Sequence, residues 1–203
     1  MLVTGIKSKP VYAPLRADLG GRYHLMLGMG PGAAALLRVL AEIQGSAPPA
    51  LQKTRVLLVA DAGAPLRTVP FDHLGLSLVS QFAGTPSLLD AFRLALGESL
   101  MGTRLYVAGP ESFIGLAMKI ALEFDLNKDE IRAEEVGTLA RRVYCVHCRT
   151  TTENVRTNIV SCTGCARWLL VRDHYSRRLA AYMGVMADAE APGELPQVME
   201  VYQ

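Results

Sequence analysis

Four cysteines are the residues of this chain best suited to chemistry. They form two C-x-x-C pairs separated by thirteen residues: Cys145, Cys148, Cys162 and Cys165. Each pair can form a tight turn that directs two thiolates to one point, and the interval is long enough for a hairpin that brings the two turns together. Zn²⁺ accepts four thiolates in tetrahedral geometry. The spacing therefore predicts one structural zinc ion, held in a ribbon.

Other readings of the cysteines stay open. Four thiolates also suit iron, in a rubredoxin-like or iron–sulfur site. A redox C-x-x-C pair and four unligated core cysteines are less favoured, because two such pairs fall close together. His147 lies inside the first pair and is either a fifth candidate ligand or an exposed turn residue. A closed four-thiolate site has no position for water, so we expect no catalysis at the metal.

A glycine-rich turn is the second candidate site. The apolar run 23–27 ends in Gly28-Met29-Gly30-Pro31-Gly32-Ala33, a G-x-G-x-x-A pattern before a helical segment. Glycines at such a turn let a phosphate approach the backbone and the helix N-terminus. The residues predicted to bind a nucleotide are Gly28, Gly30, Gly32, Asp61 and Gly109. The alternative is a tight turn with packing glycines, since Asp61 follows Ala33 by more than the usual ~20 residues.

Strands and helices must position these sites. We expect strands at 23–27, 55–60, 76–82, 104–108 and 131–136, and helices at 33–43, 87–96 and 111–124. This alternation predicts an α/β fold with an open, parallel, doubly wound sheet. Right-handed crossovers would place residues 28–32, 61–63 and 109–112 along one edge, where ligands of such sheets bind.

Charge and composition divide the chain. Residues 1–140 carry 13 basic and 13 acidic side chains, whereas 141–178 carry eight arginines against two acids, a net charge of +6. We therefore predict an α/β module over 1–140, a zinc ribbon over 141–174, and a helix with an extended tail over 175–203. The helix is expected at 176–186. The apolar tail either lies on a partner or folds back on its own sheet.

Several function classes are not supported. The chain has no run of about 20 apolar residues, and its first ten residues lack a signal-peptide core, so we expect no membrane span and a cytoplasmic location. We predict no catalytic residue, because His24 and His73 are scattered and no Ser-His-Asp arrangement suggests itself.

Residues 23–136 resemble the pyridine-nucleotide module of the ferredoxin reductase family. Gly28-Met29-Gly30-Pro31 stands at its first glycine turn, 107–113 resembles its Cys-Gly-Pro turn, and 131–135 its closing strand. Ala108 stands where that family has a cysteine near the nicotinamide. Only about twenty residues precede the first strand, so no flavin barrel is expected before it. The resemblance implies either a reductase half completed by a partner or a degenerate module kept as a scaffold.

Residues 162–185 resemble the small A-subunit family of bacterial dimethylamine monooxygenase, which is related to the haem-dependent oxidative N-demethylase. The resemblance implies a subunit of an NADPH-dependent complex that converts dimethylamine to methylamine and formaldehyde, acting in assembly or electron transfer. It also implies haem, flavin, an iron–sulfur cluster and folate on partner subunits. The positive charge leads us to expect docking through the ribbon and tail, with Arg172 and Arg177 at the contact.

Two other functions compete with this one. The eight arginines would suit a zinc ribbon that binds nucleic acid, although lysines are absent from 141–178 and the pI of 8.4 is modest. The glycine turn would suit a free-standing NAD(P)-binding oxidoreductase. Copurification separates the three: protein partners, nucleic acid, or an active chain alone.

Overall fold

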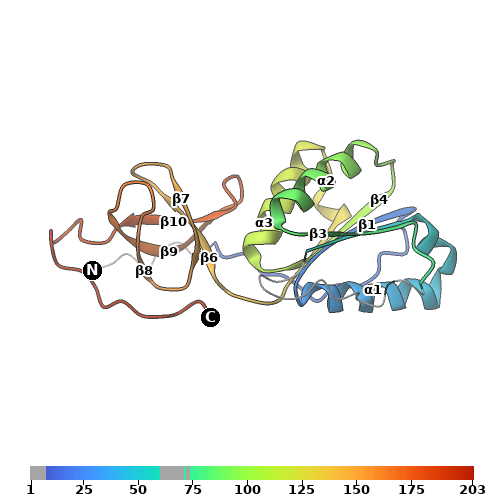
Figure 1. Cartoon of the computed structure of the whole chain (residues 1–203), viewed down its shortest axis with the longest axis horizontal. Helices are drawn as coiled ribbons and strands as arrows, with labels where there is room; N and C mark the ends of the chain where they lie inside the picture. The colour runs from blue at the N-terminus through green and yellow to red at the C-terminus, as the bar shows by residue number, and fades with distance from the viewer. Residues whose placement is uncertain (1–7, 60–70, 72–73) are drawn as a thin grey trace. The chain divides into compact units, whose positions relative to one another are not determined.

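A computed structural model describes residues 8–59, 71 and 74–203 of the chain. The chain divides into two compact units, each described by itself below (Figure 1). One runs from Tyr12 to Gly137, and the other combines the residues up to Val11 with Thr138–Gln203. Within the described ranges, no helix combines the length and apolar character that a membrane crossing needs.

The first unit is a five-stranded sheet in the order β3-β2-β1-β4-β5, with every neighbouring pair parallel. Its strands are β1 (Tyr23–Met29), β2 (Thr54–Val59), β3 (Leu78–Phe82), β4 (Thr103–Gly109) and β5 (Ile131–Glu135). Its helices are α1 (Gly32–Ser46), α2 (Thr85–Gly97) and α3 (Glu111–Glu123), with short 3₁₀ turns η1 (Pro48–Lys53) and η2 (Lys128–Glu130). The predicted doubly wound parallel sheet is confirmed.

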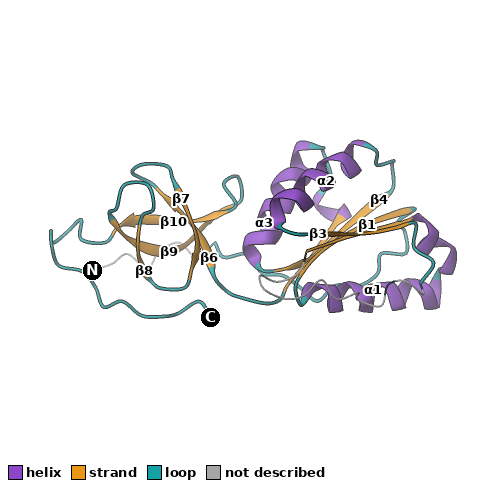
Figure 2. Cartoon of the chain, viewed as in Figure 1, coloured by secondary structure: helices purple, strands orange, loops and turns teal. Residues whose placement is uncertain are grey.

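Two apolar cores, one on each face of the sheet, explain this architecture. Leu25 and Leu27 of β1 pack into the core that includes Phe92 of α2 and Phe113 of α3. Met26, between them in sequence, packs into the core that includes Leu36 of α1. Because alternate strand residues point to opposite faces, a central strand covered on both must be apolar throughout. Figure 2 shows α1 on one face and α2 and α3 on the other.

The element boundaries differ slightly from those predicted. β3 begins at Leu78 rather than Leu76, and α2 begins at Thr85 rather than Ser87. The N-cap of α2 is Gly84. Pro86 occupies the first turn of α2, where its missing N–H costs nothing and its fixed φ favours the helix.

The second unit is also a five-stranded sheet, in the order β7-β6-β10-β9-β8. Its strands are β6 (Arg141–Cys145), β7 (Thr151–Val155), β8 (Ile159–Ser161), β9 (Trp168–Ser176) and β10 (Ala181–Met186). β10 runs parallel to β6, and all other neighbours are antiparallel. Its small core contains Val143, Leu169 and Tyr182 together with the cysteines.

The helix predicted at 176–186 is wrong. Residues 181–186 form β10, which pairs with β6 on one side and β9 on the other. Tyr182 and Gly184 are buried whereas Met183 and Val185 are half-buried, the period-2 pattern of a strand. A Cβ on Gly184 would lie 2.7 Å from Val143. Pairing and burial in the sheet override the helical preference of the local sequence.

The chain leaves the sheet between β7 and β8. β7 ends at Val155 and β8 begins at Ile159. The segment between them forms hydrogen bonds with the C-terminal tail. The N–H of Asn158 donates to the Met199 carbonyl at 3.0 Å, and the Asn158 side chain accepts from the Met199 N–H at 2.7 Å.

Arg141 holds the end of the tail in place. Its guanidinium lies 3.9 Å from the ring centre of Tyr182 and 3.8 Å from that of Tyr202. It donates to the Tyr202 hydroxyl at 3.0 Å and pairs with Asp173 at 2.7 Å. A planar guanidinium can stack on two rings and donate hydrogen bonds at its rim, which an ammonium cannot. Of the two predicted alternatives for the tail, residues 197–203 fold back on their own unit.

Candidate metal centre

The four cysteine side chains meet at one end of the second unit. Their sulfur atoms all lie within 4.8 Å of one another. Cys145 Sγ is 3.9 Å from Cys165 Sγ, and Cys148 Sγ is 3.5 Å from Cys162 Sγ. Zn–S bonds of about 2.3 Å in a tetrahedron place the sulfurs about 3.8 Å apart. The donor set therefore fits a four-thiolate metal ion.

The two C-x-x-C loops have the same backbone geometry. In the first, the Arg149 N–H donates to the Cys145 carbonyl at 2.9 Å, and the Cys145 N–H donates to the Thr150 carbonyl at 2.9 Å. In the second, the Ala166 N–H donates to the Cys162 carbonyl at 2.9 Å, and the Cys162 N–H donates to the Arg167 carbonyl at 2.9 Å. Arg149 and Ala166 both have positive φ, at 66° and 58°. The strain of these conformations is the local cost of turning two thiolates toward one point.

Contacts between the loops fix their spacing. A Cβ on Gly164 would lie 2.2 Å from Thr150 Oγ1, so only glycine permits this approach. The Gly164 N–H also points to Cys162 Sγ at 3.4 Å. On the outer side, Arg167 Nη1 lies 2.6 Å from a ring nitrogen of His147. His147 is exposed and is not part of the sulfur cluster, which agrees with its expected place on a turn.

The thiols differ in acidity. Burial raises the pKa of Cys145 to about 11, whereas hydrogen bonding to the side chain and backbone of Thr150 lowers the pKa of Cys148 to about 6. A metal binds the thiolates and displaces their protons, so its affinity falls as pH falls. The lowered pKa of Cys148 favours its thiolate, which is the form that a metal binds.

The predicted nucleotide residues lie on the other unit. Gly28 of β1 pairs with Ala108 of β4, so the first glycine turn and Gly109 lie side by side where the strand order reverses. Such a point is the usual ligand site of an open α/β sheet. Asp61 lies outside the described residues.

The glycines at this edge serve packing. A Cβ on Gly28 would lie 2.8 Å from Leu58 and 2.9 Å from Leu36. A Cβ on Gly32 would lie 2.0 Å from the carbonyl oxygen of Ala108. A Cβ on Gly109 would lie 3.0 Å from the Met29 side chain and 2.9 Å from the Phe113 side chain.

Two backbone donors of the first glycine turn are already engaged. The Gly30 N–H donates to Val59 at 3.0 Å, and the Ala33 N–H donates to Gly30 at 3.1 Å. Pro31 and Pro110 have no N–H. Glu111 puts a buried carboxyl group in the first turn of α3, where an anion would meet the positive end of the helix dipole. We predict from these features that this edge binds a nucleotide phosphate poorly.

We therefore expect weak or no binding of NADPH by the isolated chain. Calorimetric titration should give a dissociation constant no tighter than millimolar, which corresponds to a binding free energy of about −4 kcal/mol. A micromolar constant would contradict this expectation and would restore Gly28, Gly30 and Gly32 as a phosphate cradle.

Two protein-family models match the chain. One, described as dimethylamine monooxygenase subunit DmmA-like, N-terminal domain, matches residues 4–131. The C-terminal domain of the same description matches residues 142–185. A curated relative from Ectopseudomonas mendocina (strain ymp), the haem-dependent oxidative N-demethylase delta subunit, is 35% identical over 129 residues, which cover 64% of this chain and 72% of the relative.

Two solved structures with a similar fold are named as reductases. Ferredoxin reductase in carbazole 1,9a-dioxygenase matches 61% of this chain at 17% identity and a TM-score of 0.48, and the Amycolatopsis cytochrome P450 reductase GcoB matches 58% at 16% identity and 0.46. The chain spans 40% and 38% of those two proteins, and the likeness concerns the fold only. The family models, which together span most of the sequence, carry the assignment. The chain belongs to the dimethylamine monooxygenase subunit DmmA-like family.

Proposed function

We propose that this chain is a zinc-containing subunit of a cytoplasmic, NADPH-dependent monooxygenase complex that demethylates dimethylamine to methylamine and formaldehyde. The observation that carries the proposal is the four-sulfur cluster, with its two matching loops, in a chain of the DmmA-like family. The name of the relative, a subunit of an oxidative N-demethylase, supports partner subunits and the reaction type.

The role of the chain in that complex is assembly. Zn²⁺ has no redox chemistry, and four thiolates leave it no open position for substrate or water. The metal therefore fixes the fold of residues 138–203 and takes no part in the reaction. Haem, flavin, an iron–sulfur cluster and folate belong to the partner subunits, and NADPH is oxidised there.

Metal analysis tests this role. Protein prepared in ordinary medium should contain about one zinc per chain and little iron, and the isolated chain should not oxidise NADPH. A visible thiolate-to-iron absorption band would indicate a role in electron transfer and not in assembly, because four thiolates also hold a redox-active iron. NADPH oxidation by the chain alone would instead favour a free-standing oxidoreductase.

Purification of the complex tests whether the chain is a subunit of a demethylase. The chain, carrying an affinity tag, should copurify with other subunits from its source organism, and the purified assembly should release formaldehyde from dimethylamine. A chain that purifies only with nucleic acid would contradict the proposal and favour the nucleic-acid-binding ribbon.

A further inference from the structure

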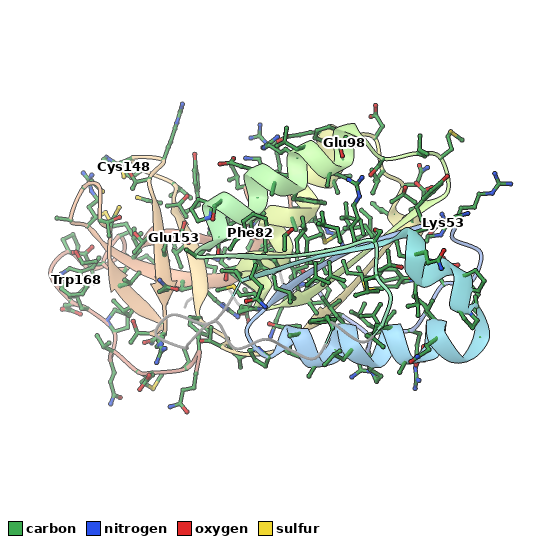
Figure 3. The ribbon with its side chains drawn as sticks, turned by 45° about the vertical axis from the view of Figure 1, so that its right-hand side comes forward. Lys53, Phe82, Glu98, Cys148, Glu153 and Trp168 are labelled. Carbon is green, nitrogen blue, oxygen red and sulfur yellow. The ribbon has the colours of Figure 1, made fainter. Side chains whose placement is uncertain are left out.

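We propose that the outer side of the metal loops is a docking surface for an acidic face of a partner subunit. This inference rests on the proposed function, since it assumes that the chain is part of a complex. The knuckle surface, as we call it, consists of Val146, His147, Arg149, Arg167 and Trp168. Figure 3 labels Cys148, Glu153 and Trp168 on the second unit.

The charge of this surface has one sign. Residues 145–151 and 161–169 contain two arginines and one histidine but no acid. The acid that follows the first loop, Glu153, accepts two bonds from Arg142 at 2.9 Å. Asp188, which follows β10, accepts from the Gly193 N–H at 3.1 Å. Among the described residues, neither Arg149 nor Arg167 forms an ion pair, so a partner with acidic groups would complement their charge.

The same surface exposes apolar side chains. Trp168, the single tryptophan of the chain, is 44% exposed, and Val146 is 47% exposed. Tryptophan and arginine are the side chains that most often dominate binding energy at protein interfaces. A protein partner accounts for both features, because an exposed tryptophan can be buried at the centre of an interface while the charges pair at its rim.

The metal loops hold these side chains in place before binding. Arg167 contacts His147 at 2.6 Å and so connects the two loops on their outer side. Bonds at 2.9 Å within each loop fix the backbone on which Arg149 and Arg167 lie. A surface that is already ordered loses little conformational entropy on binding, so more of its contact energy appears as affinity.

The test compares knuckle variants with matched controls in the full-length, metal-loaded chain. One variant is Trp168→Thr, and a second combines Arg149→Asn with Arg167→Gln; asparagine is chosen because it tolerates the positive φ at 149. The controls are Arg177→Gln with Arg178→Gln, two exposed arginines of the turn between β9 and β10, and Val198→Thr on the tail, 53% exposed. Metal content and circular dichroism confirm that each variant is folded.

The readout is the affinity of each chain for the complex assembled without it. We expect Trp168→Thr to weaken binding by at least about 30-fold, the loss typical of a hot-spot residue. The double arginine variant should bind more weakly and should lose most of the salt dependence shown by the wild type. Both controls should bind as the wild type does, which would place the contact on the knuckle surface and not at Arg177 and the tail, where the positive charge of residues 141–178 first led us to expect it.

Three results would overturn the proposal. The first is wild-type affinity in both knuckle variants. The second is loss of binding to the complex in the Arg177/Arg178 or Val198 control instead. The third is binding that disappears on nuclease treatment, which would show that the surface binds nucleic acid. A wild-type chain that binds no partner subunit at all would refute the proposed function itself, so the two failures are distinguishable.

Discussion

Replacing Cys148 with serine is expected to unfold residues 138–203 and to leave residues 12–137 folded. The variant removes one of four thiolates that lie within 4.8 Å of one another. Structural zinc contributes about 10–16 kcal/mol in zinc-finger peptides at neutral pH, which matches or exceeds the whole stability of a typical small domain. The core of this unit includes Cys145 and Cys162 themselves, so few other apolar contacts remain to compensate.

Hydrogen exchange measured by mass spectrometry, combined with elemental analysis, checks this result. Amides of β6 to β10 should exchange rapidly in Cys148→Ser, those of β1, β2 and β4 should stay protected, and the metal should fall well below one equivalent. The matched control is His147→Gln in the same loop, which should keep its metal because His147 is outside the sulfur cluster. A Cys148→Ser chain with one full equivalent of metal and a protected second sheet would refute the prediction.

Gly32→Ala is expected to destabilise residues 12–137 by about 4 kcal/mol or more, because the new methyl group meets backbone that cannot move aside. The Cβ would lie 2.0 Å from the carbonyl oxygen of Ala108 and 2.5 Å from its carbon. Relief requires α1 to move away from β4, which would open the buried contacts of Leu36 and Val39.

Urea denaturation followed through this unit gives the measurement, and Gly45→Ala on the same helix is the control. No atom lies within 4 Å of a Cβ at Gly45, so the added methyl should instead stabilise the helix by about 0.5–1 kcal/mol. If Gly32→Ala unfolds at the same urea concentration as the wild type, the close approach of α1 to β4 is incorrect, and a role for Gly32 in ligand binding becomes the better explanation.

The βα units and the two cysteine turns could be predicted because each depends on residues close in sequence. A C-x-x-C pair closes its own turn, so the spacing of Cys145 and Cys148 is enough to predict that their thiolates converge. The buried run Leu25–Leu27, with its glycine turn and helix, likewise specifies a βα unit through contacts along one stretch of chain. Alternation of such units then leaves few topologies other than a doubly wound sheet.

The sequence did not predict the elements whose conformation depends on contacts with residues distant in sequence. The sequence around Leu179–Val185 is compatible with a helix, yet these residues lie between β6 and β9, and pairing to two strands far away in sequence makes most of them β10. The tail is decided in the same way, since Arg141 binds Tyr202 from 61 residues away. Local preferences amount to tenths of a kcal/mol per residue, and burial in a sheet exceeds them.

The sequence by itself determined the two cysteine turns, the α/β unit and the family to which the chain is similar, because each depends on short spacings that any fold must respect. Only the tertiary structure decided what the glycines do and which surface the metal loops present. Gly32 is a packing residue because Ala108, brought in by β4, lies against it. Arg167 reaches His147 across twenty residues because the paired strands β6, β10 and β9 bring the two loops together. Neither distance is encoded in a local pattern, since each is set by strands that meet only when the sheet forms.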